Sequence, residues 1–114
     1  MAKTLRQVNG TYVYPDASKE LDFSGSFDLD HTAGIYYNDY TQTDDVELSI
    51  SEASVVGGNA RVKIIANGDA ITLDNAYTWT NVGSEEISTV AADENILMVN
   101  RVSATEIEYA VKVV

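Results

Sequence analysis

Residues 60–73 read ARVKIIANGDAITL. Two apolar runs of the strand-forming kind flank the tripeptide Asn67-Gly68-Asp69. Asn-Gly supplies the positive backbone φ angle that a tight hairpin turn requires. The sequence therefore predicts a β-hairpin here, in which the two runs are antiparallel neighbours.

Alternating apolar and polar residues indicate strands on both sides of this stretch. Val46, Leu48 and Ile50 alternate with polar side chains over residues 45–51, and residues 106–113 show the same alternation. Successive side chains of a strand point to opposite faces of its sheet, so each segment has one apolar and one polar face. We therefore predict a half-buried strand over both segments.

Turn signals separate further strands. Gly57-Gly58-Asn59 predicts a turn before the central stretch. Near the end of the chain, residues 95–102 and 105–113 are expected to form another hairpin, which turns close to Ser103 and Ala104.

Residues 21–29 are an upstream strand candidate. Gly25 inside this run indicates a bend or a bulge. The apolar side chains all stand at odd positions, which predicts one shared face: Leu21, Phe23, Phe27 and Leu29.

About seven or eight short strands with frequent turn signals favour an all-β fold, a single antiparallel β-sandwich or jelly roll. A length of 114 residues fits one domain. We assign this domain to residues 20–114. Residues 1–19 are expected to form an N-terminal arm or an edge strand, because Pro15 ends any ladder there.

The chain is strongly acidic, with a formal net charge of −11 at pH 7 and no Lys or Arg in residues 20–52. Phosphate binding needs a basic surface, so nucleic acid is not an expected partner. No apolar run is long enough to predict a membrane span. We interpret the acidity as a solvated surface, and a basic partner or a cation site are the alternatives.

Catalytic residue patterns are hard to find. The absence of cysteine excludes disulfides, thiolate zinc sites and a cysteine nucleophile. The single histidine, His31, lacks the sequence context of a catalytic triad. The many carboxylates are expected on polar faces and turns and not in a catalytic pair. We therefore predict a protein that is not an enzyme and needs no cofactor.

Acidic clusters offer the hard oxygen ligands that calcium prefers. They occur at residues 28–30, 43–45 and 92–95, and none has the spacing of an EF-hand loop. Asp44 and Asp45 are the candidate calcium ligands, and plain solvated carboxylates are the alternative.

Aromatic side chains are the candidates for a binding surface. Rings on an exposed sheet face stack on sugars, and neighbouring acids accept hydrogen bonds from hydroxyl groups. The alternative is that these rings pack in the core or at a subunit interface. The candidates are Tyr36, Tyr37, Tyr40, Tyr77 and Trp79.

The order of segments in the C-terminal half resembles the C-terminal β-structure of many tailed-bacteriophage virion proteins. The segments are GDAITL at 68–73, YTWTNVG at 77–83, ENILMV at 94–99 and EIEY at 106–109. In the similar proteins a short strand leads to a Trp-bearing turn with Gly, then to an apolar strand and a final hairpin strand with an aromatic residue. Many of them carry a Gly in the last hairpin, where this chain has Ser103-Ala104-Thr105.

The resemblance implies a non-enzymatic structural protein of the virion, such as a capsid decoration protein or a head-fibre or tail-fibre module, commonly a homotrimer. It implies docking on a capsid or another virion protein. A carbohydrate-binding module that uses surface aromatics is the alternative function. Basic residues at the N-terminus contrast with the acidic segment that follows, so docking is expected through an arm with these residues: Lys3, Leu5, Arg6, Val8, Tyr12 and Tyr14.

Overall fold

The computed structural model describes residues 19–29 and 34–114 in full, and residues 6–8 and 11–13 by their backbone. Within these ranges every regular element is a β-strand, and no helix is long and apolar enough to cross a membrane. The strands are β1 (Arg6–Val8), β2 (Thr11–Val13), β3 (Ser26–Phe27), β4 (Ile35–Tyr36), β5 (Tyr40–Thr41), β6 (Val46–Ile50), β7 (Asn59–Ile65), β8 (Ile71–Leu73), β9 (Thr78–Asn81), β10 (Glu94–Arg101) and β11 (Glu106–Val113).

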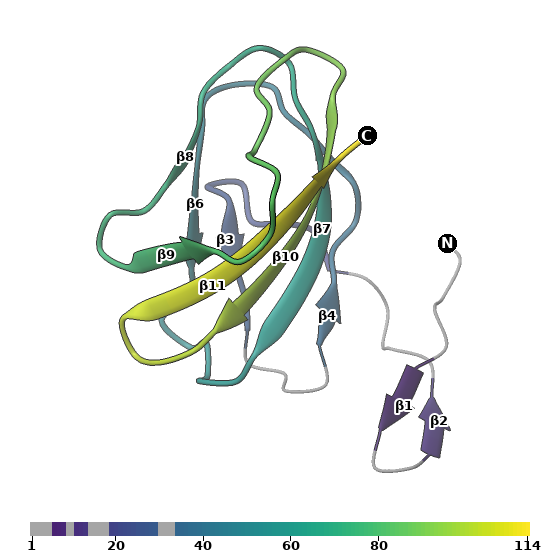
Figure 1. Ribbon diagram of the computed structural model, residues 1–114, viewed down its shortest axis with the longest axis vertical. Coiled ribbons are helices and arrows are strands. Elements are labelled where there is room, and N and C mark those ends of the chain that lie inside the picture. Colours follow the sequence, from purple (N-terminus) through teal and green to yellow (C-terminus); the bar gives the residue numbers. More distant parts are fainter. Residues whose placement is uncertain (1–5, 9–10, 14–18, 30–33) are drawn as a thin grey trace.

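Two sheets form the body of the molecule (Figure 1). The larger is six-stranded, in the order β4-β7-β10-β11-β9, with β5 also paired to β7. The smaller is three-stranded, in the order β3-β6-β8. β1 and β2 form a separate antiparallel pair.

Much of the strand pairing is parallel, so the predicted single antiparallel sandwich or jelly roll is wrong. β3, β6 and β8 run parallel to one another, and β4 and β5 run parallel to β7. The chain alternates between the two sheets and winds as a β-solenoid of about 3 turns, combined with mixed sheets. Each turn adds a strand beside the preceding one, and this is why the neighbours are parallel.

The hairpin predicted for residues 60–73 is also wrong. Gly68 does have a positive φ of 101°, as the Asn-Gly signal indicates. However, the turn carries the chain across to the other sheet: β7 pairs with β10, and β8 pairs with β6. The local turn chemistry was therefore predicted, but the partner of each strand was not.

Gln42 holds this crossing turn in place from the core. Its side chain is 2% exposed. Its Nε2 donates to the carbonyl oxygen of Ala70 at 3.0 Å, and its Oε1 accepts from the amide of Asn67 at 3.1 Å. Asn67 Oδ1 accepts in turn from the Asp69 amide at 2.9 Å. These bonds satisfy backbone groups that a two-residue hairpin would have paired across its own strands.

The predicted C-terminal hairpin is confirmed. β10 and β11 are antiparallel, with Arg101 opposite Ile107 and Asn95 opposite Val113. This hairpin lies between β7 and β9, and β9 pairs in parallel with β11. It therefore occupies the place beside β7 where a further parallel strand of the solenoid would otherwise lie.

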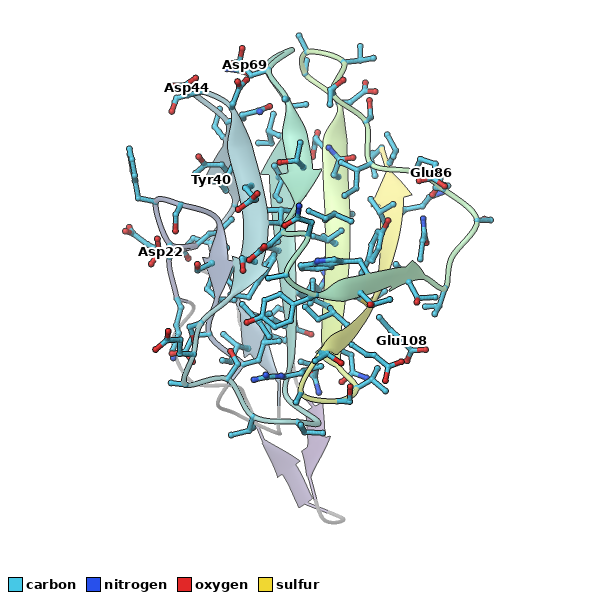
Figure 2. All side chains as sticks on the ribbon, turned by 90° about the vertical axis from the view of Figure 1, so that its left-hand side faces the viewer. Asp22, Tyr40, Asp44, Asp69, Glu86 and Glu108 are labelled. Atoms are coloured by element: carbon cyan, nitrogen blue, oxygen red, sulfur yellow. The ribbon has the colours of Figure 1, made fainter. Side chains whose placement is uncertain are left out.

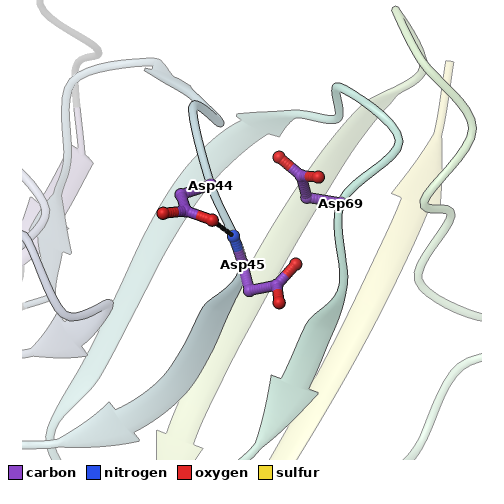
Figure 3. A group of neighbouring side chains, drawn as sticks. All are labelled: Asp44, Asp45 and Asp69. Atoms are coloured by element: carbon purple, nitrogen blue, oxygen red, sulfur yellow. Dashed lines mark hydrogen bonds between the residues drawn. The ribbon is translucent and has the colours of Figure 1, made fainter.

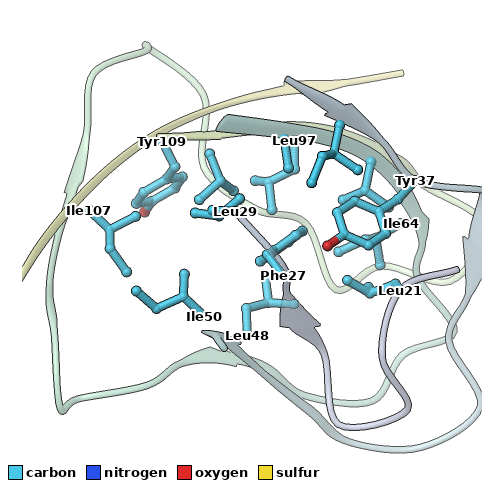
Figure 4. Close-up of a cluster of buried hydrophobic side chains, with 14 of the residues drawn as sticks. Leu21, Phe27, Leu29, Tyr37, Leu48, Ile50, Ile64, Leu97, Ile107 and Tyr109 are labelled. Atoms are coloured by element: carbon cyan, nitrogen blue, oxygen red, sulfur yellow. The ribbon is translucent and has the colours of Figure 1, made fainter. Parts of the chain in front are cut away.

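The core lies between the two sheets (Figure 4). Phe27 and Tyr37 meet edge to face with ring centroids 5.6 Å apart, and Trp79 and Tyr109 do so at 6.1 Å. Such pairs add to the stability that apolar burial gives. The buried apolar cluster consists of Leu21, Phe27, Leu29, Ile35, Tyr37, Val46, Leu48, Ile50, Ala60, Val62, Ile64, Leu97, Val99, Ile107, Tyr109 and Val111.

Candidate functional site

An open groove of about 590 Å³ lies on the outer face of the six-stranded sheet. We call it the outer groove. Figure 2 shows Glu108, from one of its walls, on the side of the molecule opposite Asp22. The side chains that shape the groove come from β4, β7, β10 and β11: Tyr36, Arg61, Met98, Asn100, Glu108 and Ala110.

A row of side chains crosses the groove from strand to strand. Tyr36 is opposite Arg61, Arg61 is opposite Met98, and Met98 is opposite Ala110. The Arg61 guanidinium carbon lies 5.9 Å from the centroid of the Tyr36 ring, a cation–π contact that orients both side chains. Met98 is 54% exposed, and the small side chain of Ala110 leaves space beside it. The row therefore places the ring of Tyr36 and the cation of Arg61 beside the apolar side chain of Met98.

A second, polar row lies beside the first. Asn59 is opposite Asn100, and Asn100 is opposite Glu108. Directly opposite residues of an antiparallel pair are close enough for their side chains to act on the same ligand. Two amides and a carboxylate thus stand side by side in the groove.

These polar groups have free hydrogen-bonding capacity. Within the described residues, the side chains of Asn59, Asn100 and Glu108 make no hydrogen bond or ion pair. The neighbouring row on the same face differs, because Lys63 Nζ lies 3.0 Å from Glu94 Oε1 and its hydrogen bond to Glu94 raises the pKa of Lys63. The polar groups of the outer groove are therefore available to a ligand.

The chemistry of the outer groove suits recognition. The charges of Arg61 and Glu108 cancel, and the amides both donate and accept hydrogen bonds. Small-molecule sites have this mixture of apolar surface and a few convergent polar groups, in volumes of about 300 to 1,000 Å³.

Three carboxylates form a second cluster, at one end of the two sheets (Figure 3). One oxygen from each of Asp44, Asp45 and Asp69 lies within 4.8 Å of the others. Asp44 Oδ1 accepts from the Asp45 amide at 2.8 Å, and Asp45 Oδ1 accepts from the Ala70 amide at 3.0 Å. Calcium would need further oxygen ligands, since it takes six to eight. The calcium site at Asp44 and Asp45 stays a prediction.

Asp69 was not among the predicted ligands. It lies in the Asn67-Gly68-Asp69 turn, far from Asp44 and Asp45 in sequence. The parallel pairing of β6 with β8 brings the two segments together, and an antiparallel hairpin over residues 60–73 would not have indicated this.

The structure separates the five predicted binding aromatics. Tyr36 lines the outer groove. Tyr37 is 6% exposed and belongs to the core, where its hydroxyl bonds the backbone of Asp28. The other three are partly buried and pack against the core cluster, which is one of the two roles left open by the sequence: Tyr40, Tyr77 and Trp79.

Phe23 was predicted to share one face with Leu21, Phe27 and Leu29, and it does not. It is 95% exposed, whereas Leu21, Phe27 and Leu29 are buried. The turn that carries it is fixed by Asp22, whose Oδ1 accepts from the amide and the hydroxyl of Ser24 at 2.9 and 2.8 Å. These bonds lower the pKa of Asp22. An aromatic ring is thereby presented to solvent on a hydrogen-bonded turn.

Most of the predicted arm lies outside the described residues. Of its docking residues, Arg6 and Val8 stand on β1 and Tyr12 on β2, with only their backbone described. The pairing of β1 with β2 was not predicted. The remaining residues named for the arm and for catalysis fall outside the described ranges: Lys3, Leu5, Tyr14 and His31.

Comparison of the chain with protein-family models, with curated proteins and with solved structures gives no significant match.

Proposed function

We propose that this protein is a non-enzymatic structural component of a tailed-phage virion, which docks on the capsid or on another virion protein. The observation that carries the proposal is the order of elements in the C-terminal half. β8 leads to β9 with Trp79, and β10 and β11 follow as an apolar strand and a final hairpin strand with Tyr109. The resemblance to phage virion proteins rests on this order of segments, although Trp79 lies in a strand here and not in a turn.

The packing of these elements supports a structural role for the aromatic residues. Trp79 and Tyr109 meet edge to face, and Trp79 Nε1 donates to the carbonyl oxygen of Asp74 at 2.8 Å. The two aromatics therefore fasten β9 to β11 and to the end of β8. The presence of Trp79 and Tyr109 at these positions is therefore explained by packing between strands, without a ligand.

Phe23 is a candidate docking contact for this role. Protein–protein interfaces often depend on a few aromatic anchors that become fully buried on binding. The Phe23 side chain is 95% exposed on a hydrogen-bonded turn, so a partner that covered it would bury a large apolar surface.

The direct experiment is fractionation of the phage that encodes this chain. An antibody against the chain should detect it in the particle band of a density gradient and label particles under the electron microscope. Detection only among the soluble proteins of the lysate would contradict the proposal.

A variant pair tests the docking contact. The purified Phe23→Ser variant should bind about tenfold or more weakly than the parent to particles from which this protein is missing, because the aromatic anchor is lost. Val90→Ser is the control, since Val90 is also an exposed apolar residue. Equal rebinding by both variants would exclude Phe23 as the contact and leave the fractionation result standing.

A further inference from the structure

We propose that the outer groove is a binding site for an uncharged saccharide. The site goes beyond the docking role and does not depend on it. Its elements are the hydrogen-bonding groups of Asn59, Asn100 and Glu108 and the apolar surface of Met98, next to the cation–π pair of Arg61 and Tyr36.

The polar groups match the hydroxyl groups of a sugar. A hydroxyl both donates and accepts, so a pair of neighbouring hydroxyls is satisfied by an amide or by a carboxylate beside a donor. Asn59, Asn100 and Glu108 stand next to one another across β7, β10 and β11. Their side chains make no hydrogen bond or ion pair with the described residues, so a ligand would not have to break protein contacts.

The apolar surface matches the other face of a sugar ring. The C–H groups of a pyranose pack on aromatic and aliphatic surface. Met98 is half exposed at the floor of the groove, and Tyr36 is held at its side by the Arg61 contact. Fixing the side chains before binding reduces the entropy lost when the ligand is bound.

The charge and position of the groove argue against other ligands. Arg61 and Glu108 cancel, and the whole chain carries −11, so an anionic glycan or a nucleic acid would be repelled. An extended peptide adds to a sheet at an open edge, but the groove lies mainly on the face of β7, β10 and β11, each of which is paired on both sides.

The experiment begins with an array of neutral, N-acetylated, sialylated and sulfated oligosaccharides. The strongest neutral binder is then titrated into ¹⁵N-labelled protein. We expect its amide shifts to concentrate on β7, β10 and β11. Absence of binding to every neutral glycan at millimolar concentration, binding to acidic glycans alone, or shifts on another face would overturn the proposal. Amide shifts at the groove that change with protein concentration in the absence of glycan would also overturn the proposal, because they would show that a second copy of the chain occupies the groove.

Variants locate the site. Asn100→Ala should weaken the binding of that glycan about tenfold, by loss of the hydrogen bonds of one amide. Ala110→Tyr, which fills the hollow beside Met98, should abolish it. Asn75→Ala is the matched control, since Asn75 is exposed, lies outside the groove and makes no side-chain hydrogen bond in the described structure. Unchanged binding by both groove variants, with melting temperatures like that of the parent, would refute the site.

Discussion

Gly58 stands where the turn before β7 passes against the backbone of Leu29. A Cβ atom at this position would lie 1.9 Å from the Leu29 carbonyl oxygen, which also accepts from the Val55 amide at 3.1 Å. The obstacle is backbone that is already hydrogen-bonded, so it cannot move aside as a flexible side chain can. The close approach of the two backbones explains why residue 58 of this turn is a glycine.

We predict that Gly58→Ala lowers the free energy of unfolding by about 3 kcal/mol, because the two backbones must separate. Gly83→Ala is the control, since the nearest atom to its Cβ would lie at an ordinary 3.4 Å. Urea unfolding of both variants gives the comparison. Similar midpoints for the two would mean that the contact at Gly58 relaxes easily.

Asp74 links the end of β8 to β6 through its carboxylate. It accepts from the Ala76 amide at 2.9 Å and from the Ser49 hydroxyl at 2.7 Å, and these bonds lower the pKa of Asp74 below its ordinary value of 3.8. A lowered pKa in the folded state stabilises the protein above pH 3.8, and this contribution is lost as the pH falls through the folded pKa.

We therefore predict that Asp74→Asn destabilises the protein at pH 7 and that this effect becomes smaller as the pH falls below 3.8, because the parent carboxylate then takes up a proton. Thermal melting of parent and variant across this range checks the sign. Asp39 is a suitable control position, because it is exposed and its contact with Lys63 spans 4.0 Å. A difference in melting temperature between the parent and Asp74→Asn that stays constant with pH would contradict the linkage between the Asp74 pKa and stability.

The sequence predicted where strands lie better than how they pair. The segments 45–51 and 106–113 contain β6 and β11, and their alternation matches the buried and exposed positions. Alternation states which face a side chain takes, but it does not identify the neighbouring strand. An Asn-Gly turn is compatible with a hairpin and with a crossing between sheets, and the crossing seen here is hydrogen-bonded to Gln42, which comes from a distant segment.

The same limit applies to the candidate site. Tyr36 was singled out as a surface aromatic, whereas Asn59, Asn100 and Glu108 were not. Glu108 stands at an outward position that the alternation over residues 106–113 indicates, whereas Asn59 was predicted to lie in a turn. Their convergence depends on the register of β7, β10 and β11, which is a property of long-range pairing. No local pattern in the chain carries that information.

The crossing turn between β7 and β8 can be tested through Gln42. We predict that Gln42→Ala lowers the free energy of unfolding by about 2 to 4 kcal/mol, because the Asn67 amide and the Ala70 carbonyl lose their partner. Thr43→Ala, at the exposed neighbouring position, should change it by less than about 0.5 kcal/mol. Hydrogen exchange should show the loss of protection at residues 67–73 first. A uniform loss of protection across both sheets would contradict a local role of Gln42 at the crossing turn.

For the whole molecule, the balance of charge sets the response to salt. The chain has 18 acidic and 7 basic residues, and the described ion pairs, such as Lys19 with Asp28, are on the surface. Surface pairs contribute about 0 to 1 kcal/mol each. The described residues span 41 × 32 × 27 Å, and charges repel one another over about 30 Å at 0.01 M salt but over only about 3 Å at 1 M. Repulsion among the carboxylates should therefore outweigh the ion pairs at low salt.

We predict that the melting temperature rises as sodium chloride increases from about 0.01 M to about 1 M, because screening relieves this repulsion more than it weakens the surface pairs. The double variant Glu20→Gln with Glu52→Gln provides the control, since both side chains are exposed and make no ion pair in the described structure. At low salt its melting temperature should be higher than that of the parent, and addition of salt should raise this temperature less than it does in the parent. A melting temperature that falls with salt in the parent would mean that the few ion pairs, including Lys63 with Glu94, contribute more than the net charge opposes.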